Sequence, residues 1–314
     1  MAARFSVALA TCQGTRYLPG LLDSLVAQSL PPCELIAGDD ASEDDTVALL
    51  EAFADSAPFP VHILRSSRRL GVTNNFSRAI AACSGDFVAL ADQDDIWRAD
   101  KLEKLSAALE TPGVQAAFSD AQVVDADLLP LGYTMWERVR FTSDEQSRLV
   151  HGEGFAVQLK HRIVTGATLA FHAGLRDIAS PIPASWPHDA WLSLLAAARG
   201  GLVAIPEPLI AYRQHADNLI GGRRKSFIQE MHVALTLDRA AWYQHEISLW
   251  RALAQRLPMT PASLLEKLAH LEVRANLPAT RLLRGKGVLQ EVLAGRYAKH
   301  ARNWGSIAID LLVK

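Results

Sequence analysis

Short apolar runs and longer amphipathic segments alternate along the first third of the chain. The apolar runs end at turn residues and predict buried strands at 5–10, 34–38, 61–64 and 87–91. Between them, apolar residues recur at helical spacing and predict helices at 18–26, 46–53 and 74–82. Strands that alternate with helices form right-handed βαβ units. We therefore expect an α/β fold with a mostly parallel sheet that is flanked by helices.

The middle of the chain continues this pattern less regularly. A helix is predicted at 101–109, and an apolar helix that starts near His188 is predicted to end at Gly200–Gly201. Further apolar runs predict strands at 114–119, 122–125, 163–171 and 202–205. The stretch 131–162 is aromatic and charged without a clear period, and we expect it to form loops.

Charge divides the chain into two parts. Residues 223–314 hold 15 Lys and Arg against 7 Asp and Glu, a net charge of +8. The other 222 residues hold 17 basic and 27 acidic residues, a net charge of −10. We predict one domain at 1–222 and a basic, amphipathic helical extension at 223–314. These helices could pack on the first domain or on a second copy of the chain, or could contact an anionic membrane surface.

The remaining composition narrows the setting. Three cysteines show neither metal-binding spacing nor a disulfide framework, which is typical of a reducing compartment. No signal-peptide pattern or membrane-span pattern is present. We expect a cytoplasmic protein, peripheral at most on the inner face of the membrane, and no nucleic-acid partner. The predicted sheet also lacks the glycine patterns of dinucleotide-binding folds and of P-loops.

Carboxylates follow two of the predicted strands. Asp92, Asp94 and Asp95 come directly after the run 87–91, and Asp39–Asp40 follows the run 34–38. Ligands bind at the carboxyl ends of strands in open α/β sheets. Clustered like charges favour a bound divalent cation such as Mg²⁺ or Mn²⁺. An acidic turn that caps the next helix is the alternative, and two acidic strand ends together favour a nucleotide site.

Two later motifs add candidate side chains. Asp189 lies close to the start of a predicted helix, where the helix dipole favours the ionised carboxylate. Its alternative role is to cap that helix. Arg213 and His215 follow a short predicted strand.

Taken together, these motifs resemble the family 2 glycosyltransferases with the GT-A fold, most closely the bacterial rhamnosyltransferase-like members. The matching stretches run in the family's order over about the first two thirds of the chain, at 7–28, 38–46, 70–76, 91–97, 188–191 and 212–215. The resemblance implies a GT-A-type sheet, and transfer of a sugar from a nucleotide-diphosphate sugar to a hydroxyl of a glycan or lipid-linked acceptor. The stretch 131–162 would then face the acceptor. Bacterial surface polysaccharide synthesis is the implied setting.

The resemblance also implies roles for single residues. Asp92 and Asp94 fall on the two ends of the family's D-x-D motif, and Asp189 falls on its catalytic base. Asp94 and His215 are implied as metal ligands, with Mg²⁺ or Mn²⁺ as the cofactor. The implied nucleotide-sugar-binding residues are Thr11, Asp40, Asn75, Asp92 and Arg213. Relatives usually carry Tyr-Asn where this chain has Cys12–Gln13, and the tyrosine stacks on the base, so the base preference is open.

Physical chemistry agrees with this interpretation. A divalent cation stabilises charge on a departing diphosphate, and Asp189 could take the proton of the attacking hydroxyl. Direct displacement inverts the anomeric centre. A nucleotidyltransferase is the main alternative, but the segment 11–16 supplies only one arginine for a triphosphate. A catalytically inactive carbohydrate-binding or scaffold domain is the second alternative.

Overall fold

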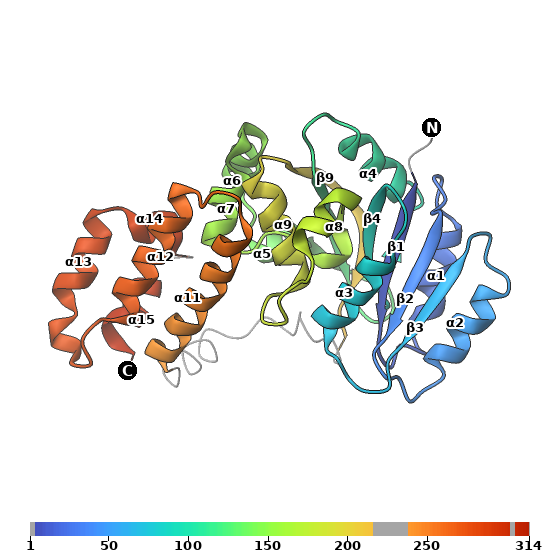
Figure 1. The fold of residues 1–314 in the computed structure, drawn as a ribbon, viewed down its shortest axis with the longest axis horizontal. Helices are drawn as coiled ribbons and strands as arrows, with labels where there is room; N and C mark the ends of the chain where they lie inside the picture. The colour runs from blue at the N-terminus through green and yellow to red at the C-terminus, as the bar shows by residue number, and fades with distance from the viewer. Residues whose placement is uncertain (1–3, 216–237, 302–304, 314) are drawn as a thin grey trace. The chain divides into compact units, whose positions relative to one another are not determined.

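The computed structural model describes residues 4–215, 238–301 and 305–313. These residues form two compact units, one of residues 1–154 and 163–215 and one of residues 155–162 and 216–314. Within the described residues, the first unit contains a nine-stranded sheet in the order β3-β2-β1-β4-β8-β6-β9-β5, with β7 paired to β6 (Figure 1). The boundary predicted between 222 and 223 lies outside the described residues.

The first four strands form the parallel part of the sheet, as the sequence predicts. Their bounds are β1 Phe5–Thr11, β2 Glu34–Asp39, β3 Val61–Arg65 and β4 Phe87–Asp92. They are joined by α1 (Leu18–Val26), α2 (Thr46–Ala54) and α3 (Val72–Ala82).

Side chains alternate between the two faces of these strands. Phe5, Val7 and Leu9 of β1 are fully buried in the core that contains the apolar residues of α1, α2 and α4 (Lys101–Leu109). Helix α3 packs against β1 and β2 through the buried ring of Phe76. Figure 1 shows α3 and α1 on opposite faces of the sheet.

The rest of the sheet is mixed. Strand β8 (Leu169–His172) runs antiparallel to both β4 and β6 (Ala116–Val124). Strand β9 (Leu202–Arg213) is parallel to β6 and antiparallel to the short β5 (Ile96–Trp97). The helices of this part are α8 (Ala173–Ala179) and α9 (His188–Ala198), and a short 3₁₀ turn, η2 (Gly166–Thr168), precedes β8.

Two sequence expectations for this region are wrong in their extent. The strand expected at 163–171 begins only at Leu169, because the 3₁₀ turn η2 precedes it. The strand expected at 202–205 continues to Arg213 through Pro206 and Pro208, which lack backbone donors. Strand β9 passes these prolines with a register shift between Ser119 and Asp120 of its partner β6.

The loops expected at 131–162 are instead mostly helical. Thr134 and Thr142 each form a reciprocal capping box with the glutamate three residues later. Trp136 and Phe141 are buried against Phe118 of the sheet, with ring centroids 5.8 Å and 5.9 Å from it. The elements are β7 Pro130–Thr134, α5 Met135–Val139, α6 Ser143–Arg148, the π-helical η1 Leu149–Glu153 and α7 Gly154–Lys160.

The second unit is helical in its described part, as predicted. It comprises α11 (Arg239–Arg256), α12 (Ala262–Ala275), η3 (Arg281–Leu283), α13 (Gly285–Leu293), α14 (Arg296–His300) and α15 (Gly305–Leu312). Residues 155–162, which include most of α7, belong to this unit. Among the described residues, no helix combines the length and the hydropathy that a membrane span needs.

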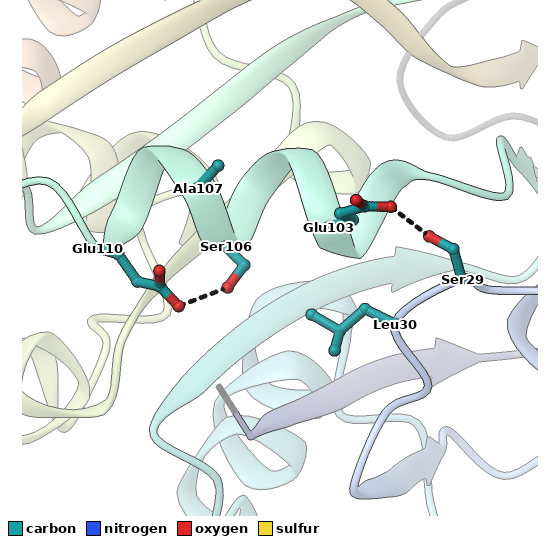
Figure 2. A pocket seen from close by; sticks show the side chains of 6 residues that line it. All are labelled: Ser29, Leu30, Glu103, Ser106, Ala107 and Glu110. Carbon is teal, nitrogen blue, oxygen red and sulfur yellow. Dashed lines mark hydrogen bonds between the residues drawn. The ribbon is translucent and has the colours of Figure 1, made fainter. Parts of the chain in front are cut away.

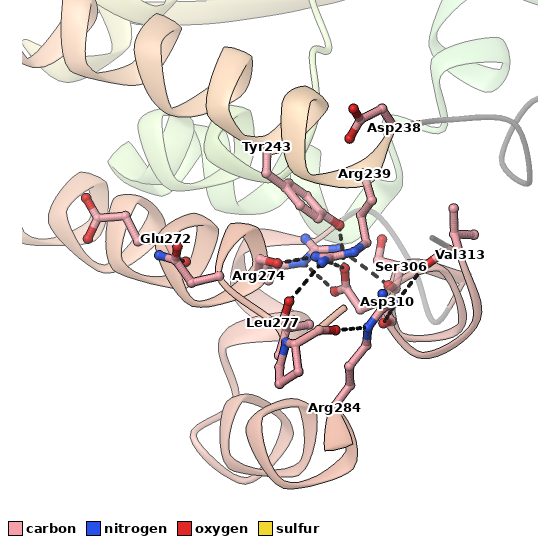
Figure 3. A network of polar contacts seen from close by, with 12 residues as sticks. Asp238, Arg239, Tyr243, Glu272, Arg274, Leu277, Arg284, Ser306, Asp310 and Val313 are labelled. Carbon is pink, nitrogen blue, oxygen red and sulfur yellow. Dashed lines mark hydrogen bonds and ion pairs between the residues drawn. The ribbon is translucent and has the colours of Figure 1, made fainter. Parts of the chain in front are cut away.

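A buried carboxylate joins the helices of this unit (Figure 3). Asp310 of α15 is fully buried. Its Oδ1 accepts a hydrogen bond from the hydroxyl of Tyr243 at 2.8 Å. Its Oδ2 accepts from Nε of Arg274 and from the hydroxyl of Tyr297, both at 2.6 Å. The side chain therefore links α11, α12, α14 and α15 through one charge.

We predict that Asp310→Asn destabilises the second unit by about 3 kcal/mol, because it leaves the buried guanidinium of Arg274 without its carboxylate. Urea denaturation followed by far-UV circular dichroism measures this change. The matched control is Glu272→Gln, which removes a half-exposed partner of Arg251 and should change stability by less than about 0.5 kcal/mol. Equal denaturation midpoints for Asp310→Asn and the unmodified chain would contradict the role of Asp310.

Candidate active site

The register of the parallel strands places the acidic strand ends together. Thr11 of β1 lies opposite Asp39 of β2, and Ala10 of β1 lies opposite Asp92 of β4. The carboxyl ends of three neighbouring strands therefore meet at one edge of the sheet. This is the edge where ligands bind in open α/β folds.

On the β2 side, the two carboxylates are held by hydrogen bonds from loops. Oδ1 of Asp39 accepts from the hydroxyl of Thr11 at 3.1 Å and from the hydroxyl of Ser42 at 2.6 Å. The two oxygens of Asp40 accept from the backbone N–H groups of Leu70 and Gly71, at 2.6 Å and 2.9 Å. Thr11 and Asp40, both expected to bind nucleotide, thus fix the loops that surround the strand ends.

Asn75, the third of the expected nucleotide-binding residues, is buried on α3. Its Nδ2 donates to the carbonyl of Gly38 at 2.6 Å. Its Oδ1 is buried and has no hydrogen-bond partner among the described residues. A Cβ at position 38 would lie 2.6 Å from that oxygen, so this close approach requires glycine. Asn75 therefore ties α3 to the end of β2 and keeps one acceptor unused.

Gln93, between the two aspartates of the D-x-D motif, bridges to the first loop. Its Oε1 accepts from the N–H of Cys12 at 2.8 Å, and its Nε2 donates to the carbonyl of Cys12 at 3.0 Å. The guanidinium of Arg69 reaches Sγ of Cys12. The loop that carries cysteine in place of the family's tyrosine is therefore fixed to the end of β4 through its backbone.

Asp95 is buried and Asp92 is partly buried, and both lie near like charges. Burial, followed by the charges of Asp94 and Asp189, raises the pKa of Asp92 to about 7. Burial, followed by the charges of Asp94 and Asp92, raises the pKa of Asp95 well above its usual range. Oδ2 of Asp95 is buried without a hydrogen-bond partner among the described residues. The cluster therefore has more negative charge than its protein environment compensates.

Lys101, at the start of α4, is the buried cation beside this cluster. It is 0% exposed, and its Nζ donates to the carbonyl of Ala167 at 2.7 Å. The same atom lies 3.3 Å from the centre of the Trp97 ring. Burial lowers the pKa of Lys101 well below its usual range, and the charges of Asp95 and Asp92 partly oppose this shift. One lysine therefore lies near two carboxylates, of which that of Asp95 is buried.

Asp94 meets the residues at the end of β9. Nε2 of His215 lies 2.9 Å from Oδ2 of Asp94, and Nε of Arg213 donates to the carbonyl of Asp94 at 2.8 Å. The backbone N–H of Arg213 donates to Oδ1 of Asp95 at 3.0 Å. The ring of Tyr17 lies beside both residues, with its centre 4.7 Å from that of the His215 ring and 4.6 Å from the guanidinium of Arg213. Asp94 and His215, both expected as metal ligands, thus lie within hydrogen-bond distance of each other.

The donor set suits a hard divalent cation. Carboxylate oxygens and an imidazole nitrogen are ligands of Mg²⁺ and Mn²⁺, which commonly take their other ligands from substrate phosphates and water. The described residues contain no group of three or more His, Cys, Asp and Glu arranged to hold a metal by themselves. The uncompensated charge at Asp92 and Asp95 is what a bound cation would offset. Asp94 and His215 therefore fit a metal whose coordination a diphosphate completes.

Asp189 lies in the first turn of α9, and the position that caps this helix is Pro187. Its Oδ1 accepts from the N–H of Ala190 at 2.7 Å. Its charge raises the pKa of Asp92, which places the two carboxylates in the same cluster. Next to it, the buried His188 stacks on Phe76 with the ring centroids 4.0 Å apart, and burial lowers the pKa of its imidazole. A carboxylate is therefore held at the site by a rigid, buried neighbour.

A separate hollow lies away from these carboxylates (Figure 2). It has a volume of about 410 Å³ and lies between α4 and the loop after α1. Its two carboxylates are already paired, Glu103 with the hydroxyl of Ser29 and Glu110 with that of Ser106. An anionic diphosphate would meet two more negative charges there, so this hollow does not suit a nucleotide sugar.

Sequence reasoning did not single out several of these residues as part of the site. The sequence predicts that Lys101 starts a helix and that Tyr17 is an aromatic residue at the start of another helix. The sequence predicts Asp95 either as one of three clustered carboxylates or as a cap of the next helix, and it does not single out Asp95 as a residue of the site. Gln93 carries no charge, and its partner Cys12 is distant in sequence. The sequence signal for Lys101 was the group of three aspartates at 92–95, because such a group requires a positive charge nearby.

The chain is similar in sequence to several known proteins. Residues 6–159 match the model of "Glycosyl transferase family 2". Among curated relatives, an uncharacterized glycosyltransferase of Nostoc is 22% identical over 219 residues, which is 68% of this chain and 66% of that protein. The dTDP-rhamnosyl transferase RfbG of Shigella flexneri is 25% identical, over 76% of this chain and 82% of the relative. An Escherichia coli protein, the UDP-Glc:alpha-D-GlcNAc-diphosphoundecaprenol beta-1,3-glucosyltransferase WfaP, is 23% identical over 76% of this chain and 87% of its own.

Solved structures agree on the fold. Residues 1–349 of S. aureus TarS in complex with UDP-GlcNAc have a TM-score of 0.58 at 15% identity, covering 93% of this chain and 77% of that structure's chain. The mannosyltransferase PcManGT of Pyrobaculum calidifontis, in complex with GDP-Man and Mn²⁺, has a TM-score of 0.55 at 19% identity and covers 94% of this chain and 76% of its own. Residues 6–159 thus match glycosyl transferase family 2, and the first unit has a GT-A-like fold.

Proposed function

We propose that the protein transfers a sugar from a nucleotide-diphosphate sugar to a hydroxyl of an acceptor, with inversion at the anomeric centre. The observation that carries this proposal is the cluster of Asp92, Asp94 and Asp189 at one sheet edge, with His215 on Asp94. In this proposal the cluster combines a site for the donor diphosphate with a general base. The family match favours a glycosyltransferase over the nucleotidyltransferase alternative.

The donor diphosphate would be held at Asp94 and His215 together with Mg²⁺ or Mn²⁺. When bound, the cation stabilises the negative charge that develops on the departing diphosphate. Arg213 lies beside this pair and contributes a permanent positive charge on the same side. Support also comes from the Mn²⁺ in the complex of PcManGT, a protein of the same fold.

The nucleoside would lie over the ends of β1, β2 and β4. The proposed contacts come from Thr11, Asp40, Asn75 and Asp92, of which Asn75 offers an unused buried acceptor. Cys12 cannot stack on a base as an aromatic ring does. We propose that Cys12 and its neighbours contact the edge of the nucleotide base. The choice among nucleotides would then depend on hydrogen bonds.

Asp189 would act as the general base. Its carboxylate takes the proton of the acceptor hydroxyl while the oxygen attacks the anomeric carbon and the bond from that carbon to the diphosphate breaks. The sugar–oxygen bond forms as the nucleoside diphosphate leaves, and the configuration inverts because one displacement occurs. The adjacent His188 is buried and stacks on Phe76.

The names of two relatives support a proposal for the acceptor and the setting. RfbG is named as a dTDP-rhamnosyl transferase, and WfaP is named as acting on a sugar linked to diphosphoundecaprenol. We propose a hexosyl or rhamnosyl donor and a glycan or lipid-linked acceptor in bacterial surface polysaccharide synthesis. A lipid-linked acceptor would require the protein to work at the inner face of the membrane.

The first prediction concerns the metal. Isothermal calorimetry with Mn²⁺ and nucleoside diphosphates should show binding that weakens at least about tenfold in Asp94→Ala, because one carboxylate ligand is lost. EDTA should weaken binding to the unmodified chain in the same way. The control is Asp23→Ala, an exposed aspartate on α1. Nucleotide binding by the unmodified chain that is the same with and without EDTA would contradict the metal site.

The second prediction concerns Asp189. Asp189→Asn keeps the hydrogen bond from Ala190 but cannot take a proton, so kcat should fall by about 10²–10⁴. Donor affinity and the unfolding midpoint should stay unchanged, and Asp177→Asn, an exposed aspartate on α8, is the control. Initial rates and NMR of the anomeric proton provide the measurements. Near-normal transfer by Asp189→Asn, or a product that retains the donor configuration, would show that Asp189 is not the base of an inverting reaction.

A further inference from the structure

The outer side of η3 and α13 exposes an unusual amount of apolar surface. Leu282, Leu283, Leu289 and Leu293 are 93%, 65%, 56% and 78% exposed. Leu289 and Leu293 are four residues apart on α13 and therefore lie on one side of this helix. Together with the exposed Arg281 and Lys286, these four leucines are called the α13 face below.

The other side of α13 is already packed. Val288 lies in a small core with Leu277 and Tyr297. Glu291 is buried and lies 2.6 Å from Nδ1 of His270 and 2.7 Å from Nη1 of Arg296. The helix is thus anchored by one side, and the leucines of the α13 face point away from the core of their own unit. Exposed apolar patches of this kind mark interaction sites.

Charge decides which partner suits the α13 face. Between residues 276 and 301 the sequence contains one acidic residue, Glu291, and the structure buries it. Arg281 and Lys286 therefore flank the exposed leucines without an exposed carboxylate from the same segment. A symmetric contact with a second copy would bring two such basic faces together, which is unfavourable. An anionic lipid surface offers the opposite charge and an apolar interior.

We infer that the α13 face docks on an anionic lipid bilayer. The leucines enter the boundary between head groups and acyl chains, while Arg281 and Lys286 contact lipid phosphates. This surface is a property of the second unit and does not require the proposed reaction. Only its use, to bring the enzyme to a lipid-linked acceptor, rests on the proposed function.

Co-sedimentation with vesicles tests this inference on the full chain without any sugar donor. Vesicles of phosphatidylcholine alone are compared with vesicles that also contain phosphatidylglycerol. The unmodified chain should pellet with the anionic vesicles, and less so as salt is raised. Leu289→Gln combined with Leu293→Gln should weaken the partitioning about tenfold. Lys286→Glu should weaken it at least about fivefold, and only on anionic vesicles.

The matched control is Leu129→Gln, a leucine of the first unit that is 64% exposed. It should bind vesicles as the unmodified chain does. Equal pelleting with both vesicle types, or no pelleting, would overturn the inference. Light scattering provides a second check, because a dimer that the double leucine variant abolishes would assign the α13 face to a second copy. Transfer to a water-soluble acceptor, measured in parallel, separates these outcomes from a failure of the proposed function.

Discussion

The arrangement of the first unit depends on one electrostatic constraint, which is that three aspartates lie close together at the end of β4 with the buried Lys101 and Arg213 beside them. Lys101 meets this constraint through three contacts at once: the charges of Asp92 and Asp95, the Trp97 ring and the carbonyl of Ala167. A buried charge without partners would cost several kcal/mol. Lys101 therefore links strand β5, through Trp97, and the turn η2, through Ala167, to the carboxylates.

The remaining negative charge is what gives the site its chemistry. Asp94 lies within hydrogen-bond distance of His215 and beside Arg213, whose guanidinium lies over the ring of Tyr17. In the proposed reaction a divalent cation would offset this negative charge and would carry the donor diphosphate, so that metal binding and donor binding would be linked. The empty cluster is then less stable than the loaded one, and ligand binding is expected to tighten the loops that carry these residues.

The sequence predicted the parts of the fold whose signal is local. Apolar runs identify β1 to β4, and the acidic strand ends identify the edge that matters. Apolar periodicity did not predict the helices at residues 131–162, because this stretch has no regular apolar spacing. The two capping boxes at Thr134 and Thr142 were the helix signal in the sequence. It also ended β9 too early, because Pro206 and Pro208 suggest a break that a register shift avoids.

Contacts between distant segments were beyond the sequence. Helical periodicity could assign Lys101 to a helix but could not show that its side chain is buried beside the carboxylates. The pairing of Asp94 with His215 was expected from the family pattern and not from spacing, since 121 positions separate the two residues. Such partners become visible only when strand order and register are known.

The close approach of Gly14 to Gln93 has an evolutionary consequence. A Cβ at position 14 would lie 2.3 Å from Oε1 of Gln93, and that oxygen is engaged by the backbone of Cys12. A lineage that acquires a side chain at position 14 must therefore shorten the residue at position 93 or lose the link between the two loops. The two positions should covary among homologues, and glycine at 14 should accompany a long amide within the D-x-D motif.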